Sequence, residues 1–362
     1  MTYLDHNAGT PLFPEVAEFL AAAFRREPAG NPSSVHRAGR AARARLDEAR
    51  ARVARVVGRP AREVLFTASG SEACATAVLG IGRGGALVTS AIEHPCVLLA
   101  AQRRATPVLQ VRPGPDGWVA PDAFEGAFAS GEVAACALQV ANNETGVVQP
   151  ADAVAALARA HGVASFVDAV QAPGRLSPAF EADLVAYSAH KFGGPAGVGI
   201  LAVRRGVQLE PLVPGHQEGG LRGGTPAVVL CEAAALALEL AESRRQAEVA
   251  RMTALRDGFE RGLRTRRSSI RVHGAEAPRL ANTTNVCFPG VDAETVLIAL
   301  DLEGFAVSVG AACTSGTMRP SPVLLSMGVS EADARSSIRV SFGRDTTEGD
   351  VSALLRALDR VL

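Results

Sequence analysis

The sequence predicts an α/β protein built on a mainly parallel central sheet, followed by a smaller α+β part. From about residue 64, short runs rich in β-branched residues alternate with Ala-rich stretches of helical character. The runs are apolar throughout, which is typical of strands that are covered on both faces. Strands that alternate with helices in this way form parallel sheets.

The strand-like runs are bordered mainly by glycine, proline and polar residues. They are VLFTA from residue 64, ALVTS from 86, PVLQV from 107, VAACALQV from 133, VASFVDA from 163, DLVAYSA from 183 and VGILAV from 198. After about residue 245 the pattern changes: a long charged helix leads into only two strand-like runs, NTTNVCFP and SSIRVSFG, and then a closing helix. This change marks the α+β part.

Composition narrows the class of protein. The chain has 362 residues, which fits about two domains, and it is 48% hydrophobic and 20% charged, as in soluble enzymes and binding proteins. The formal net charge is zero, so no overall field favours nucleic acid or an acidic membrane. The arginine-rich helix expected near residues 40–57 is better explained by a solvated face than by RNA binding. Because the first residues lack a basic and an apolar region, we expect no export signal and a cytoplasmic location.

The six cysteines are scattered through the chain, at positions 74, 96, 136, 231, 287 and 313, without CxxC spacing. This pattern argues against a disulfide framework and against a cysteine-rich zinc site, so we expect no metal. The most apolar stretch, residues 227–241, contains two glutamates and is too short to span a bilayer. We expect it to form a buried helix.

Lys191 is the only lysine, beside 36 arginines. A lysine amine can lose its proton and attack a carbonyl, whereas a guanidinium remains protonated. The composition therefore suggests amine chemistry at Lys191. Taken alone, it is equally compatible with an accidental survivor in an arginine-biased sequence.

Polar residues follow several of the strand-like runs, where ligands bind in parallel sheets. Gly70 and Ser71 open a helix and suit a phosphate, although a serine there can simply cap the helix. Asp168 can pair with a cationic ring nitrogen or cap the next helix. His94 also follows a strand and, alone, is more often a structural histidine.

Together these residues describe one cofactor. Pyridoxal phosphate requires a Schiff-base lysine, a carboxylate for its ring nitrogen and a phosphate site. Ser188 and His190 add polar groups beside Lys191. A competing motif, GIGRGG at residues 80–85, matches the dinucleotide pattern GxGxxG, but a helical run precedes it and a strand follows, so we interpret it as a helix-to-strand turn.

The chain resembles the cysteine desulfurases, which are pyridoxal-phosphate enzymes of the class V aminotransferase group, along nearly its whole length. The matching segments are YLDHNAGT, GNPSSVHRAG, EVLFTASGSEA, EHPCVL, NNETGVVQP, VDAVQAPG, SAHKFGGPAGVG, LRGGT, GAACTSG and SSIRVSFGR. The resemblance implies fold type I of these enzymes. It implies a large cofactor-binding domain over residues 11–245, and a small domain of residues 1–10 with 246–362 that carries a catalytic cysteine loop.

The resemblance also implies a role for each matching residue. Lys191 would bind the cofactor covalently, and the phosphate would be held by Gly70, Ser71, Ser188 and His190. The ring would be held by His94, Asp168, Gln171 and Asn143. The substrate carboxylate would be bound by Arg339, helped by Asn31. Thr225 would reach the phosphate of the neighbouring subunit, which implies a homodimer with shared sites.

Cys313 is the cysteine that we expect to act as the nucleophile. Its segment, SVGAACTSGTMRPS, is rich in Gly, Ser and Thr and is interpreted as a mobile loop, where a thiolate can react. Four other cysteines lie in apolar helix or strand patterns, where cysteine is usually inert. Cys96, two residues after His94, is the alternative.

The implied reaction converts free L-cysteine to L-alanine. Lys191 would remove the α-proton and Cys313 thiolate would attack the substrate sulfur, which leaves a persulfide that passes to an acceptor protein. An aminotransferase or a selenocysteine lyase with the same cofactor is one alternative, although the former needs no nucleophilic cysteine. A non-catalytic binding protein of the same fold is another.

The chain departs from the usual desulfurase pattern in three places. It has LDHNAGT and LVPGHQEGGLRGGT where other residues are common, and it ends soon after its last helix. The first two departures leave the expected chemistry intact. The third leaves the acceptor open among an iron–sulfur scaffold, a tRNA-thiolation relay and a DNA-modification partner.

Overall fold

The structure is a computed structural model that describes residues 1–25, 30–129, 131–310 and 319–362. Its centre is a seven-stranded sheet with the order β2-β8-β7-β6-β5-β3-β4. The strands are β2 (Val64–Thr67), β3 (Ala86–Ser90), β4 (Val108–Val111), β5 (Val133–Gln139), β6 (Ala164–Asp168), β7 (Leu184–Ser188) and β8 (Gly199–Val203). Only β8 runs against its neighbours among these strands, so the predicted mainly parallel sheet is confirmed.

Helices cover both faces of this sheet, as its fully apolar strands require. The connecting helices are α3 (Gly70–Gly80), α4 (Pro95–Ala101), α5 (Pro121–Phe128) and α6 (Ala151–Ala160). Neighbouring residues of one strand, such as Leu65 and Phe66, point to opposite faces. Leu65 packs in a core with α3, whereas Phe66 packs in a core with α2 (Arg37–Val57) and the first half of α7 (Val228–Arg266). The turn predicted at residues 80–85 joins α3 to β3.

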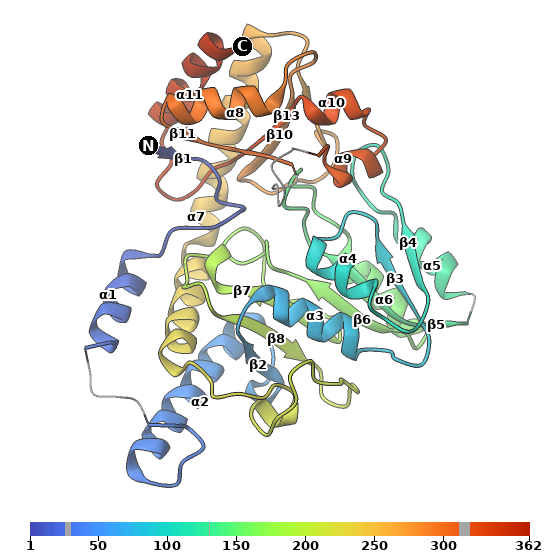
Figure 1. The fold of residues 1–362 in the computed structure, drawn as a ribbon, viewed down its shortest axis with the longest axis vertical. Helices are drawn as coiled ribbons and strands as arrows, with labels where there is room; N and C mark the ends of the chain where they lie inside the picture. The colour runs from blue at the N-terminus through green and yellow to red at the C-terminus, as the bar shows by residue number, and fades with distance from the viewer. Residues whose placement is uncertain (26–29, 130, 311–318) are drawn as a thin grey trace.

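A second, four-stranded antiparallel sheet has the order β12-β13-β10-β9. Its strands are β12 (Ser308–Val309), β13 (Ser337–Ser341), β10 (Thr283–Cys287) and β9 (Arg271–Val272). The helices α8 (Ala293–Leu302) and α11 (Glu348–Val361) pack with it, and Figure 1 shows this assembly above the central sheet. The remaining helices are α1 (Pro14–Ala23), α9 (Pro322–Ser326) and α10 (Glu331–Arg335), with short 3-10 turns at Ala61–Glu63, Ala189–Lys191 and Glu218–Gly220.

Helix α7 connects the two assemblies. The apolar run of residues 227–241 and the charged run that follows form one continuous helix of 39 residues. Leu238 packs in the core of the central sheet, whereas Phe259 packs in the core of the second sheet. The division of the chain into two domains at residues 10 and 245 remains a prediction.

The N-terminal segment lies between the two sheets. Strand β1 (Thr2–Tyr3) pairs in parallel with β11 (Phe305–Ala306), and Asp5 bridges to Ser341 of β13. The side chain of Asn7 donates a hydrogen bond of 2.8 Å to Thr283 Oγ1 in β10. These bonds bring residues 5–8 to the edge of the central sheet where Lys191 lies.

Candidate active site

A cavity lies at the carboxyl ends of the central strands, as the sequence predicts. Its walls include most of the predicted site residues, namely Gly70, Ser71, His94, Asn143, Asp168, Gln171, Ser188, His190 and Lys191. These residues come from the last positions of strands and from the loops and helix starts that follow different strands. Parallel strands bring them together, because the carboxyl ends of the strands meet at one edge.

Lys191 projects from the short turn that follows β7. Its amine donates hydrogen bonds of 2.6 Å to the carbonyl oxygen of Asn7 and 2.9 Å to that of Ala8. Burial, with the nearby guanidinium groups of Arg175 and Arg339, lowers the pKa of Lys191 to about 8. The amine therefore loses its proton much more easily than an exposed lysine does. No sequence pattern indicates that the carbonyl groups of Asn7 and Ala8 bind this amine.

Asp168 is the last residue of β6 and is almost fully buried. One carboxylate oxygen accepts a hydrogen bond of 3.0 Å from the backbone N–H of Val170. Burial, and then the neighbouring Cys96, raises the pKa of Asp168 to about 6. A buried carboxylate of this kind is stabilised by a cation, and a protonated pyridine nitrogen is such a partner.

His94 caps the N-terminus of α4. Its Nδ1 accepts a hydrogen bond of 3.1 Å from the backbone N–H of Cys96 and lies 3.0 Å from Cys96 Sγ. The contact with Cys96 raises the pKa of His94. The side chain is exposed and lines the cavity, so it has the freedom to contact a flat ring.

The N-terminus of α3 forms one end of the cavity. Ser69 caps this helix by accepting from the N–H of Glu72, so the cap is Ser69 and not Ser71. Gly70 permits a close approach, because a Cβ atom there would lie 2.6 Å from the Cβ of Ser188. Ser188 Oγ in turn lies 2.9 Å from Nδ1 of His190. A helix N-terminus without side-chain bulk, beside a hydroxyl and an imidazole, fits a phosphate group.

Gln171 and Asn143 complete the wall, and Arg175 supports it from behind. The buried guanidinium of Arg175 donates to the side-chain oxygen of Gln171 and, at 3.1 Å, to the carbonyl oxygen of His6. Burial, and then repulsion from Arg339, lowers the pKa of Arg175 to about 10. No motif distinguishes Arg175 from the 35 other arginines of the sequence, and only the fold places it beside Lys191.

Arg339 lies on β13 and is buried next to the cavity wall. It donates to Asp5 Oδ1 at 2.6 Å and to the carbonyl oxygen of Asn143 at 3.0 Å. Its Nε is buried without a hydrogen-bond partner in the described part of the chain. A buried, unpaired N–H group of a guanidinium is suited to donate a hydrogen bond to an additional anionic group.

Among the described residues, the predicted site residues Arg339, Asn31 and Thr225 are not part of the cavity lining. Asn31 is exposed, and its side-chain oxygen accepts from the N–H of Ser33. Thr225 is also exposed and is not part of the cavity wall of its own chain. Cys313, and with it the predicted mobile loop, lies outside the described residues.

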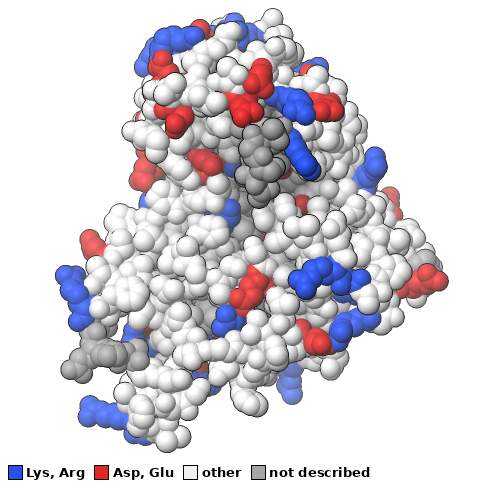
Figure 2. All heavy atoms as spheres, in the orientation of Figure 1, with Lys and Arg blue, Asp and Glu red and all other residues white. Residues whose placement is uncertain are grey.

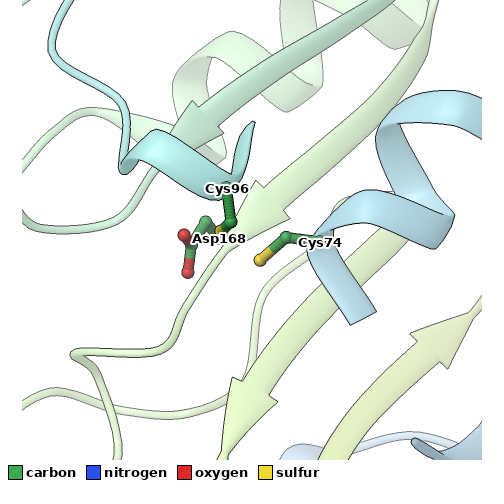
Figure 3. Close-up of side chains that lie close together, drawn as sticks. All are labelled: Cys74, Cys96 and Asp168. Carbon is green, nitrogen blue, oxygen red and sulfur yellow. The ribbon is translucent and has the colours of Figure 1, made fainter. Parts of the chain in front are cut away.

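Two further cysteines line the cavity beside Asp168. Cys74 belongs to α3 and is buried, and Cys96 belongs to the first turn of α4. Figure 3 shows both side chains directed toward Asp168. The hydrogen bond with Cys74, and then that with His94, lowers the pKa of Cys96 to about 5. By contrast Cys136, Cys231 and Cys287 are buried in β5, α7 and β10. Cys74, which the apolar pattern groups with these three as inert, instead lines the cavity. That the other three are inert remains a prediction.

The chain matches a known protein family. The aminotransferase class V family matches residues 2–354. The chain belongs to the aminotransferase class V family. Two class V relatives are the IscS-like cysteine desulfurase of Mycobacterium tuberculosis, 38% identical over 99% of this chain and 95% of the relative, and the cysteine desulfurase IscS of Dictyoglomus turgidum, 35% identical over 99% and 94%.

Solved structures agree with this class V assignment. A NifS-like protein superposes with a TM-score of 0.91 at 30% identity, over 99% of this chain and 98% of the other. DndA from Streptomyces lividans superposes with a TM-score of 0.76 at 33% identity, over 94% and 99%. The predicted fold class and the predicted relationship to the cysteine desulfurases are confirmed, and the predicted activity agrees with the names of the relatives.

Proposed function

We propose that this protein is a pyridoxal-phosphate-dependent cysteine desulfurase that converts L-cysteine to L-alanine and forms a persulfide on Cys313. One observation carries the proposal: in a class V chain with relatives named cysteine desulfurases, an easily deprotonated lysine, a buried carboxylate and a phosphate-sized helix N-terminus line one cavity. Those three features are the requirements of pyridoxal phosphate.

The chain's own residues would hold the cofactor as follows. Lys191 binds it covalently, because its lowered pKa supplies a neutral amine near neutral pH. Asp168 pairs with the ring nitrogen, and His94 contacts the ring face. The phosphate is bound by Gly70, Ser71, Ser188 and His190, and the ring substituents by Asn143 and Gln171.

Substrate binding and chemistry then fall to three residues. Arg339 binds the carboxylate of cysteine, helped by Asn31, and the buried unpaired Nε of Arg339 supports that role. The bound cofactor withdraws electrons from the substrate α-carbon. Lys191 takes the α-proton and later returns it. Cys313 thiolate attacks the substrate sulfur, so that the carbon–sulfur bond breaks, a sulfur–sulfur bond forms, and alanine leaves.

The direct test is to incubate the protein with cysteine and a reductant and to quantify alanine and sulfide together. We expect equal amounts of both, because each persulfide that is reduced corresponds to one alanine. Keto acid formed with an added amino-group acceptor, without sulfide, would instead identify an aminotransferase.

Cys313→Ser separates the desulfurase from other pyridoxal-phosphate enzymes. The variant should bind the cofactor and should change the cofactor spectrum on addition of cysteine, yet form no alanine, because a hydroxyl attacks sulfur poorly. Mass spectrometry of the parent protein should find one extra sulfur on the peptide with Cys313. An extra sulfur on Cys96, or alanine formation by Cys313→Ser at the parent rate, would contradict the assignment.

The proposal extends to the protein's surroundings. The protein acts as a homodimer in which Thr225 reaches the partner's phosphate site, and it passes sulfur to an acceptor protein in the cytoplasm, where iron–sulfur cluster biogenesis is one destination. Acidic and basic side chains are interspersed on the face in Figure 2, so this face carries no continuous basic patch of the kind that binds nucleic acid. Among the described helices, none has the length and apolar character to cross a membrane.

A further inference from the structure

Cys74, Cys96 and Asp168 form a cluster of potential metal ligands in the cavity. One sulfur of each cysteine and one oxygen of the carboxylate all lie within 4.8 Å of one another (Figure 3). The three side chains come from α3, α4 and the end of β6, so three separate elements hold them in place. Cys74 and Asp168 are buried, at 1% and 7% exposure.

The proposed desulfurase reaction does not use the thiols of Cys74 and Cys96. Its nucleophile is Cys313, and Asp168 is assigned to the cofactor ring. In the sequence, Cys74 and Cys96 are separated by 21 residues and match no metal-binding spacing, so the spacing predicts no metal site. The fold brings them together because α3 and α4 begin at the same edge of the sheet.

Two sulfur ligands and one carboxylate suit a thiophilic divalent cation. Zinc binds thiolate at about 2.3 Å and carboxylate at about 2.0–2.2 Å in tetrahedral sites, which places the ligand atoms roughly 3.5–3.8 Å apart. Ligands within 4.8 Å reach this spacing with side-chain adjustments of about 1 Å. All three residues line the cavity, which would leave room for water as a fourth ligand.

We propose that the protein without its cofactor binds one divalent cation of the zinc class through Cys74, Cys96 and Asp168. On binding, each thiol that is still protonated releases its proton to water. This inference rests on the proposed function in one respect: cation and pyridoxal phosphate exclude each other because both require the carboxylate of Asp168. The cation thereby competes with loading of the cofactor.

Cadmium is a suitable probe, because thiolate–cadmium bonds absorb in the ultraviolet at a longer wavelength than thiolate–zinc bonds, clear of the peptide absorbance. The titration uses the full cofactor-free chain in a Cys313→Ser background, which removes the loop thiol from the count. We expect a charge-transfer band that saturates at one cadmium per chain. Cys74→Ala and Cys96→Ala should each abolish or strongly weaken it, whereas Cys136→Ala, which removes a buried thiol from β5, should leave it unchanged.

Two results would overturn the site: no saturable band in the Cys313→Ser protein, or a band that persists in both Cys74→Ala and Cys96→Ala. A second measurement needs no further substitution. Addition of pyridoxal phosphate should release the cadmium and remove the band, and the cofactor-loaded protein should bind none. If cadmium and cofactor bind together, mutual exclusion through Asp168 is wrong. Alanine formation from cysteine by the loaded parent enzyme tests the proposed function separately, since that assay contains no added cation.

Discussion

At the scale of single residues, Lys191 differs from the arginines around it because its environment lowers its pKa and so favours loss of its proton. The side chain is half-buried near Arg175 and Arg339, and its amine is held by two backbone carbonyl groups. Loss of hydration, and then repulsion from the guanidinium groups, lowers the pKa and favours the neutral form, and the carbonyl groups fix its position. An arginine in the same place would remain charged and could not attack a carbonyl group.

Lys191→Arg should therefore abolish the absorbance of the covalently attached cofactor while preserving a positive charge at the site. The measurement is the visible spectrum of the purified variant after incubation with pyridoxal phosphate. Alanine formation from cysteine should fall to background. A variant with the parent spectrum and normal turnover would show that another group holds the cofactor.

The lowered pKa predicts a pH dependence with a definite direction. Because the pKa of Lys191 is about 8, well below the usual lysine value, the neutral amine should accumulate as the pH rises through 8. The rate of covalent cofactor attachment to the cofactor-free protein should rise over that range and then level off. Arg175→Gln removes a nearby positive charge and should move the midpoint to higher pH, whereas Arg175→Lys should move it less. An unchanged midpoint in Arg175→Gln would refute the electrostatic contribution of Arg175.

Asp168→Asn should reduce turnover far more than it reduces cofactor affinity. An amide cannot hold a proton on the ring nitrogen, so electron withdrawal weakens, whereas the phosphate site around Ser188 and His190 remains. The check is a pair of measurements on one preparation, cofactor affinity by spectral titration and alanine formed per minute. Near-normal turnover would place the ring-nitrogen partner elsewhere.

The side chains around the cavity were predictable from the sequence because each follows an apolar strand, and strand ends converge in a parallel sheet. Lys191, Asp168 and His94 follow this rule. The carbonyl groups of Asn7 and Ala8 were not predictable, since every residue carries a carbonyl group. The proximity of Cys74 and Cys96 was not predictable from the sequence, because it depends on the placement of two helices and not on spacing along the chain. The sequence also allows Ser71 to be the helix cap. The structure shows that Ser69 is the cap, because Ser69 has the extended backbone conformation that a cap requires.

At the scale of elements, α2 is anchored to the segment after β8 by a buried ion pair. Arg50 of α2 donates two hydrogen bonds, of 2.6 and 2.8 Å, to the carboxylate of Glu218, which also accepts from the N–H of Phe66 in β2. The side chain of Glu218 is 2% exposed. Loss of the arginine would leave a buried carboxylate without its cation.

Arg50→Ala should therefore lower the free energy of unfolding by about 3 kcal/mol. The matched control is Arg43→Ala on the same helix, because Arg43 pairs with Asp47 in an exposed (i, i+4) ion pair and should cost under about 1 kcal/mol. Urea unfolding followed by circular dichroism gives both values, with cofactor at the same saturating concentration. Equal losses in the two variants would contradict the distinction between buried and exposed pairs.

The strands and connecting helices were largely predictable, since apolar runs of four to seven residues between polar or glycine-rich turns leave few alternatives. The continuity of α7 was less evident. Its first half is apolar and its second half is charged, so the sequence suggests two helices with different environments. The structure joins them because no glycine or proline interrupts the segment between Val228 and Asp257.

At the scale of the whole molecule, the exposed position of Thr225 raises the question of whether one chain or two chains contribute residues to each active site. Thr225 does not line the cavity of its own chain, so its proposed phosphate contact requires a second subunit. Mixing an inactive Lys191→Ala chain with an inactive Thr225→Ala chain should then restore some activity, because one site of the hybrid carries both residues. Each variant must be inactive alone, and mass spectrometry must show that mixed dimers form. Mixed dimers without activity would refute shared sites.

The path of the N-terminal segment has a consequence for biosynthesis. Asn7 and Ala8, whose carbonyl groups hold the lysine amine, leave the ribosome first, but Asp5 and Asn7 pair with Ser341 and Thr283, which leave it near the end. The central sheet, from Val64 to Val203, is complete long before those strands exist. A nascent chain therefore contains Asn7 and Ala8 before the strands that anchor this segment exist. The contacts that position the amine of Lys191 can be completed only after Thr283 and Ser341 have been translated, so a chain that ends before them lacks this anchorage.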